Sequence, residues 1–229
     1  MNYSLSAFSE PRGVMRILQF IFAICAFATT TNFIATVKVS CPPSPAVEYS
    51  FEYPFSIEQG ICSVNTSTKL QNSSKTYPIS ANLSSDSQFF VATGVLSLMY
   101  CVFIIAVYAI LDELYRSKNE IPLADFMLTT ILAIFWLSGS AAWSNGATAL
   151  KGVTDPDVLR ANCKNCDFVV GSFSRLNISL IFGFLNFFLW ASDLWFLYKE
   201  TIWFQGRAAA QQQQAASGAG VSSGGVPGV

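Results

Sequence analysis

Residues 89–111 read FFVATGVLSLMYCVFIIAVYAIL, an apolar stretch of 23 residues without a charged side chain. A helix needs about 20 consecutive apolar residues to cross the hydrocarbon core of a bilayer, so this stretch predicts a transmembrane helix. Three further stretches meet the same criterion, and the four predicted helices span about 17–39, 89–111, 124–146 and 176–200. The sequence therefore predicts an all-α membrane protein with one four-transmembrane-helix bundle over residues 17–201.

The composition agrees with a membrane protein and excludes several functional classes. Apolar residues make up 52% of the chain and charged residues only 12%, about half the charged share of a soluble domain. The net charge is −1 and the basic residues do not cluster, so the footprint of a nucleic-acid-binding protein is missing. The chain has no histidine, which removes Ser-His and Cys-His pairs and histidine-based metal centres. We therefore expect no enzyme, no cofactor and no metal.

The two ends of the chain require separate interpretations. Arg12 and Arg16, the apolar run after them and the string Ala26-Phe27-Ala28, which has small residues at its two outer positions, imitate a signal peptide with its cleavage site. The apolar run continues to Val37, however, and is longer than the 7 to 15 residues of a signal, so we predict an uncleaved first helix behind a cytosolic arm, residues 1–16. Residues 202–229 are rich in Ala, Gln, Ser and Gly and are predicted to be a disordered cytosolic tail.

Cysteines and glycosylation sequons indicate the orientation in the membrane. Four of the six cysteines and three of the five sequons lie in the two predicted loops of about 40–88 and 147–175: Cys41, Cys62 and the sequons at Asn65, Asn72 and Asn82 in the first, Cys163 and Cys166 in the second. Cys25 and Cys101 fall inside predicted helices, and the sequons at Asn2 and Asn177 fall in the cytosolic arm and at the membrane edge, where we expect no glycan. Disulfides form in oxidising compartments, and Asn-x-Ser/Thr is a surface signal of secreted segments. We therefore predict that both loops are luminal and that both termini are cytosolic.

The four loop cysteines allow three disulfide pairings. The simplest has one bridge within each loop, Cys41 to Cys62 and Cys163 to Cys166, and the other two pairings stay open. The Cys-x-x-Cys spacing also occurs in zinc sites and in thiol-disulfide catalysts. A structural zinc site needs four ligands, and a redox motif is expected beside a βαβ unit, so we predict structural bridges.

Polar residues inside the predicted helices are the candidates for function within the membrane. A charge at the bilayer centre costs at least about 2.5 to 3.5 kcal/mol on insertion scales, which makes Asp193 the first candidate. Asp193 lies in the last two turns of the fourth helix, where it reaches the cytosolic headgroups, is protonated, or bonds to a neighbouring helix. For Asn32 and Asn186 we predict interhelical hydrogen bonds.

Small and aromatic residues suggest how the helices pack and where they meet the interfaces. Ser179 and Gly183, and likewise Ser138 and Ala142, have the four-residue spacing that permits close approach of two helices. Trp143 falls near a predicted membrane interface, which is typical of an aromatic belt residue.

Short strings distributed along most of the chain carry a family resemblance. They are FAICAFAT at 22–29, FEYPF at 51–55, DF at 125–126, WL at 136–137, AW at 142–143, TDP at 154–156, LNIS at 176–179, IFGFLN at 181–186, LW at 189–190, LWF at 194–196 and YKET at 198–201. In their order and spacing they resemble the synaptophysin family, four-helix vesicle proteins of the MARVEL type, from about Arg16 to Thr201.

The resemblance implies a non-catalytic protein of synaptic or other secretory vesicles that acts in trafficking, exocytosis and retrieval. It also implies a homo-oligomer in a hexamer-like ring, cholesterol-rich membrane, and binding to the vesicle SNARE synaptobrevin (VAMP) and to the vesicular proton ATPase. The chain departs from the family in a tail without Tyr-Gly repeats, in the close spacing of Cys163 and Cys166, and in the charge of Asp193. An ion channel or transporter and a cell-junction tetraspan are the alternatives.

Overall fold

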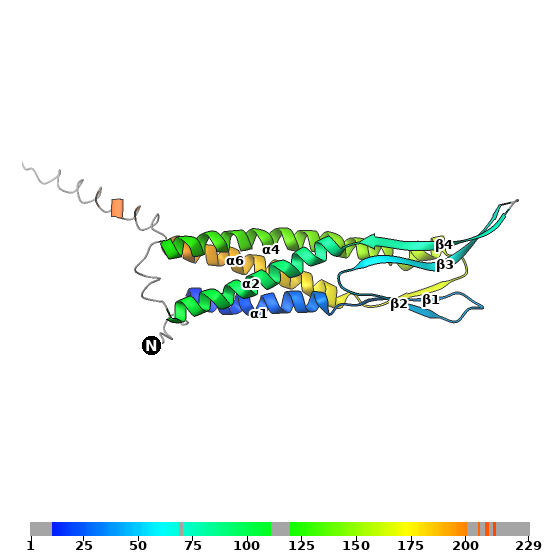
Figure 1. Cartoon of the computed structure of the whole chain (residues 1–229), viewed down its shortest axis with the longest axis horizontal. Coiled ribbons are helices and arrows are strands. Elements are labelled where there is room, and N and C mark those ends of the chain that lie inside the picture. Colours follow the sequence, from blue (N-terminus) through cyan, green and yellow to red (C-terminus); the bar gives the residue numbers. More distant parts are fainter. Residues whose placement is uncertain are drawn as a thin grey trace, which may run out of the picture.

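A computed structural model describes residues 11–68, 71–110 and 120–200, together with residues 206, 209, 210 and 213. It contains four long helices that lie side by side and, beyond one end of them, two small sheets (Figure 1). Residues 1–10 of the predicted arm and all of the predicted tail, 202–229, except residues 206, 209, 210 and 213 lie outside the described residues.

The four long helices are α1 Pro11–Thr31, α2 Ser84–Ile110, α4 Glu120–Val153 and α6 Ser174–Glu200. All four are long and apolar enough to cross a membrane, which confirms the predicted four-helix bundle. The longest, α4, has 34 residues and at 1.5 Å per residue measures about 51 Å. This length exceeds the hydrocarbon thickness of about 30 Å, and the extra turns support the sheets, since α4 contacts β4.

The first helix ends eight residues before its predicted end at residue 39. Its last residues are the β-branched Thr29, Thr30 and Thr31, which have low helix propensity. Their hydroxyls donate back to helix carbonyls, for example Thr30 Oγ1 to Ala26 O at 3.0 Å. Apolar residues then alternate with polar ones in the strand β1 Ala35–Ser40, so the part of the prediction beyond Thr31 is wrong.

The two loops between the helices add β-strands, which lie outside the membrane bundle. The first sheet is antiparallel in the order β2-β1-β5, with β2 Val47–Phe51 and β5 Asp167–Val170 on either side of β1. The second is a long antiparallel hairpin of β3 Ser56–Thr68 and β4 Gln71–Asn82. We call the five strands and the short helix α5 Pro156–Asn162 the disulfide domain.

Helix α5 follows directly from its sequence. Asp155 is the N-cap, and its side chain accepts a hydrogen bond from the backbone N–H of Asp157 at 2.8 Å. Pro156 occupies the first turn, where its missing N–H costs nothing. The TDP string at 154–156 is thus a helix start, and it positions Cys163 at the end of α5.

The larger of two hydrophobic clusters among the described residues extends from the bundle into the disulfide domain. Phe55, which is fully buried, stacks on Trp143 of α4 with ring centroids 5.4 Å apart, and it also contacts Phe33 after α1. Phe55 has a φ of 64°, which is rare for a bulky residue and is fixed here by complete burial. Trp143 is fully buried and donates to Ser179 Oγ at 3.0 Å, so the prediction of a belt residue is wrong.

The small residues of α6, but not those predicted in α4, mediate close helix contacts. Ser179 is fully buried, and a Cβ built at Gly183 would lie 2.6 Å from Phe90 of α2 and 2.6 Å from Ser140 of α4. Ser138 is exposed instead. The packing face of α4 is one or two residues displaced from the predicted one, since Gly139 and Ser140 are buried there.

Gly183→Ala is expected to lower the free energy of unfolding by about 1 to 3 kcal/mol, because the new methyl overlaps a ring and a hydroxyl. Gly152→Ala is the matched control, since no atom lies within 4 Å of its Cβ position, and it should be neutral or stabilising by up to about 1 kcal/mol. Denaturation in detergent measures both. Equal effects of the two substitutions would contradict close packing at Gly183.

Candidate functional site

An arginine, Arg16, lies inside the helix bundle with its side chain fully buried. Its Nη2 lies 2.6 Å from Asp125 Oδ1 of α4, and its Nη1 lies 2.9 Å from Asp193 Oδ2 of α6. The guanidinium also lies over two neighbouring aromatic rings, 5.2 Å from the ring centre of Tyr100 and 5.3 Å from that of Trp190. One cation therefore joins α1 to α4 and α6 and stacks on α2.

Asp125 is the second member of the site and has the most hydrogen-bond donors. Tyr108 of α2 donates to its Oδ2 at 2.5 Å, Tyr100 donates to its Oδ1, and Thr129 one turn further along α4 donates at 3.3 Å. The side chain is 1% exposed. Charge-assisted hydrogen bonds of this kind are about twice as strong as neutral ones, and they orient the carboxylate towards Arg16.

Asp193, the first candidate from the sequence, bonds to neighbouring helices. Besides Arg16, it accepts a hydrogen bond from Gln19 Nε2 of α1 at 3.2 Å, and it is fully buried. Of the three alternatives considered above, contact with a neighbouring helix is the one that the structure shows. Asp193 does not lie at the surface of the protein.

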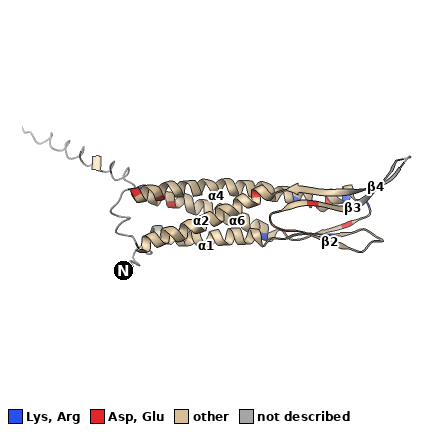
Figure 2. Cartoon of the chain, viewed as in Figure 1, with Lys and Arg blue, Asp and Glu red and all other residues tan. Residues whose placement is uncertain are grey.

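We call this group the ionic cluster: Arg16, Gln19, Tyr100, Tyr108, Asp125, Thr129, Trp190 and Asp193. All four long helices contribute to it. Arg16 and Asp125 each lie five residues after the start of their helix, Tyr108 and Asp193 within two turns of the end of theirs. The ionic cluster therefore forms one layer of the bundle at the end opposite the sheets, while the middle of the bundle carries few charged residues (Figure 2).

Most residues of the ionic cluster could not be predicted from the sequence of each helix taken separately. The predicted cytosolic arm, residues 1–16, includes Arg16, and Asp125 is the second residue of the helix predicted at about 124–146, so neither is a candidate for an intramembrane contact. Their positions in the sequence indicate the contact. Arg16 lies one or two turns after the start of its helix, and Asp125 and Asp193 lie at a similar distance from the same membrane face in two other helices. In an antiparallel bundle these positions meet in one layer.

The two predicted interhelical asparagine contacts are wrong. Asn32 lies in an exposed turn after α1. Asn186 is fully buried, but its Nδ2 donates to Phe182 O of its own helix at 2.8 Å. Buried asparagines find the nearest acceptor, and here that acceptor is one helical turn away.

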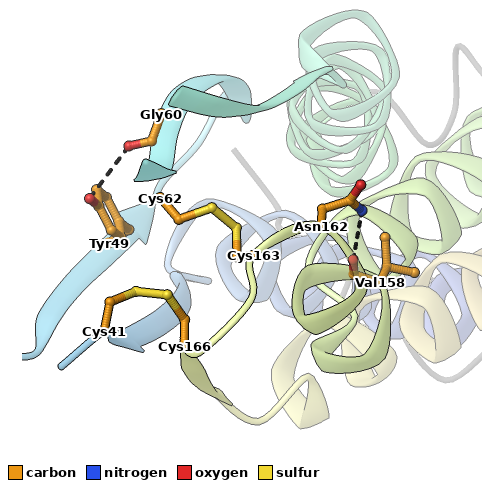
Figure 3. The surroundings of a disulfide bond; sticks show 8 residues. All are labelled: Cys41, Tyr49, Gly60, Cys62, Val158, Asn162, Cys163 and Cys166. Atoms are coloured by element: carbon orange, nitrogen blue, oxygen red, sulfur yellow. Dashed lines mark hydrogen bonds between the residues drawn. A yellow bond between two sulfur atoms is a disulfide. The ribbon is translucent and has the colours of Figure 1, made fainter. Parts of the chain in front are cut away.

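The disulfides connect the two loops to each other. Cys41 is bonded to Cys166 and Cys62 to Cys163 (Figure 3). All four predicted cysteines are thus oxidised, but the simplest pairing within each loop is wrong. The tertiary structure explains the pairing, because β5 of the second loop pairs with β1 of the first loop. In this register Ser40 is opposite Asp167, which places Cys41 beside Cys166.

The three predicted glycosylation sequons lie on one hairpin. Asn65 of β3 is opposite Ser74, Asn72 of β4 is opposite Ser67, and Asn82 is exposed at the end of β4. The hairpin extends beyond the bundle in Figure 1. Glycosylation at the three asparagines stays a prediction.

Substituting Asn65, Asn72 or Asn82 with glutamine is expected to remove one glycan each from protein made in a secretory cell. Peptide-N-glycosidase digestion and gel mobility provide the measurement. Asn177→Gln is the control, because the sequon at Asn177 lies in the first turn of α6, one of the helices able to span a membrane. Identical mobility before and after digestion of the wild type would contradict the predicted orientation.

Four helices able to span a membrane, joined inside by a buried ionic cluster and capped by a disulfide domain, define a multi-pass membrane protein. Residues 7–196 match MARVEL, the membrane-associating domain, over most of the chain. The protein therefore belongs to the MARVEL family.

Proposed function

We propose that this protein is a non-catalytic scaffold in the membrane of synaptic or other secretory vesicles. In this function it forms homo-oligomers in cholesterol-rich membrane and binds the single membrane helix of synaptobrevin during vesicle trafficking, exocytosis and retrieval. The disulfide domain faces the vesicle lumen and both termini face the cytosol. The likeness of the FEYPF string and of the α6 strings to the synaptophysin family supports this reading within the MARVEL family.

The observation that carries the proposal is a stripe of exposed apolar side chains on α6. Ile181, Phe188 and Trp195 are 63%, 62% and 60% exposed. Their seven-residue spacing places them on one face of the helix over four turns. In a bilayer, helices associate by packing rather than by the hydrophobic effect, and such a stripe offers large, shaped side chains to one further helix.

Co-purification from mild detergent tests the proposal. The wild type should retain synaptobrevin, and the triple variant Ile181→Ala, Phe188→Ala, Trp195→Ala should lose it. The matched control is Met99→Ala, Val102→Ala, Phe103→Ala on α2, three residues with similar exposure, and it should retain synaptobrevin. Recovery of none by the wild type, with the oligomer intact, would overturn the proposal.

Ion transport is a second candidate function, and the ionic cluster is the observation that favours it. Ionisable residues within membrane helices often mark ion pathways and proton relays. Vesicles reconstituted with the wild type would then show an ion flux that changes with Asp193→Asn. Equal flux in vesicles with the wild type, with Asp193→Asn and without protein would dismiss it.

A further inference from the structure

The two disulfides differ in accessibility. Cys41 and Cys166 are both partly exposed, whereas Cys62 and Cys163 are 7% and 2% exposed. A cavity of about 420 Å³ opens beside the exposed bridge and is lined by Cys41, Cys166, Cys62, Pro43, Tyr49 and Lys164. A thiol in solution therefore reaches the Cys41–Cys166 bridge first.

The two cysteines of the Cys-x-x-Cys motif are not bonded to each other, and we call them, with their partners Cys41 and Cys62, the crossed cysteines. Cys163 and Cys166 bond to different partners, although a turn at Lys164 and Asn165 is all that separates them. The outer residues of a β-turn have Cα atoms less than about 7 Å apart. Disulfides form at Cα separations of about 4.4 to 6.8 Å, so a direct bond between Cys163 and Cys166 is within reach of this turn.

We propose that the crossed cysteines form a thiol-disulfide exchange site for a luminal dithiol, at which one two-electron reduction opens both bridges between the loops. The dithiol is the reductant, and Cys166 is the residue that transmits its effect to the buried bridge. The product has one disulfide, Cys163–Cys166, in place of two, and free thiols at Cys41 and Cys62.

The reaction has three exchange steps. A thiolate of the dithiol bonds to Cys41 Sγ, and the Cys166 thiolate leaves. Cys166 Sγ then bonds to Cys163 Sγ, the Cys62–Cys163 bond breaks, and the Cys62 thiolate leaves and takes a proton from water. The second thiol of the dithiol finally displaces Cys41, which also takes a proton. The dithiol is oxidised to its disulfide, and its two electrons and two protons are recovered in the thiols of Cys41 and Cys62.

The exchange changes how the two loops are held together. Before it, two covalent links join β1 and β3 of the first loop to the segment between α5 and β5. After it, the hydrogen bonds and packing of β1 against β5 remain, and no disulfide links the loops. The reduction of one exposed bridge is thus sufficient to release the buried one.

A pair of variants tests the role of Cys166 in the full-length protein. Cys41→Ser leaves the Cys166 thiol free, and we expect exchange without added reductant: Cys62 becomes labelled by a maleimide and a Cys163–Cys166 bond forms. Cys166→Ser leaves Cys41 free instead, and only Cys41 among the loop cysteines should be labelled. Labelling at Cys166 with an intact Cys62–Cys163 bond in the first variant, or labelling at Cys62 in the second, would overturn the proposal.

The wild type provides a test that does not depend on how the variants fold. After less than one equivalent of a dithiol and an acid quench, Cys41 and Cys62 should be labelled equally. Trypsin separates Cys163 from Cys166 at Lys164, so their bond joins the peptides 161–164 and 165–175. A glutamyl protease acting at Glu48, Glu52 or Glu58 separates Cys41 from Cys62. Equal labelling of Cys41 and Cys166, with Cys62 bonded to Cys163, would overturn the proposal.

Discussion

Arg16→Gln is expected to lower the free energy of unfolding by about 3 to 5 kcal/mol, the cost of removing one partner from a buried ion pair. The glutamine preserves length and polarity but not charge, so Asp125 and Asp193, both buried, lose the cation that joins them. Two carboxylates then face each other at one layer of the bundle. The measurement is denaturation of the purified protein in mixed micelles, compared with wild type.

Three further variants test whether the loss comes from the charge. Arg16→Lys should lie between wild type and Arg16→Gln, because an ammonium cannot contact both carboxylates in the planar geometry of a guanidinium. The double variant Arg16→Gln, Asp193→Asn should be less destabilised than the sum of its single variants, since the residues interact directly. Lys38→Gln breaks only an exposed pair with Glu48 and should change stability by about 0.5 kcal/mol or less. A similar small change for Arg16→Gln would contradict the ionic cluster as a stabilising layer.

Replacing all four loop cysteines with serine is expected to unfold the disulfide domain. The Cys62–Cys163 bridge joins residues 101 apart, and closing a loop of this length is worth about 4.7 kcal/mol of chain entropy. When the Cys62–Cys163 bridge is already formed, the Cys41–Cys166 bridge closes a loop of only about 24 residues, which runs through 41–62 and 163–166. The same dependence of chain entropy on loop length gives about 3.5 kcal/mol for this second loop. The total of about 8 kcal/mol is comparable to the whole stability of a typical domain.

The two bridges should therefore not contribute additively. The variant Cys62→Ser, Cys163→Ser removes one bridge and should lose about 3.5 kcal/mol, less than half the effect of removing both. Limited trypsin digestion at Arg160, in the last turn of α5, and at Lys164, after its C-cap, reports the opening of the domain. A quadruple variant as resistant to trypsin as the wild type would show that packing alone holds the loops together.

The membrane bundle could be predicted from the sequence because its signal is local. Each of the four apolar stretches meets the length requirement by itself, and no knowledge of a partner segment is needed. Where the prediction failed at the end of α1, two local signals competed: residues 32–39 are apolar enough to extend a helix, but Ala35, Val37 and Val39 alternate with exposed or partly exposed residues in β1. The two-residue alternation that indicates a strand is difficult to recognise here, because it lies within a longer apolar run.

The ionic cluster and the disulfide pairing could not be predicted in the same way because they depend on tertiary structure. Arg16 and Asp125 are 109 residues apart in the chain, and the packing of α1 and α4 against both α2 and α6 brings them to one layer. The pairing of Cys41 with Cys166 follows from the register of β1 with β5. Sequence spacing favoured bridges within each loop, and spacing contains no information about strand pairing between loops.

The length of α4 has a mechanical consequence for the whole molecule. This one uninterrupted helix contains both Asp125 of the ionic cluster and Trp143, on which Phe55 of the disulfide domain stacks. The two residues are 18 positions apart, about 27 Å along a rigid rod. The ionic cluster and the aromatic contact with the disulfide domain are therefore held at a fixed separation by one continuous helix.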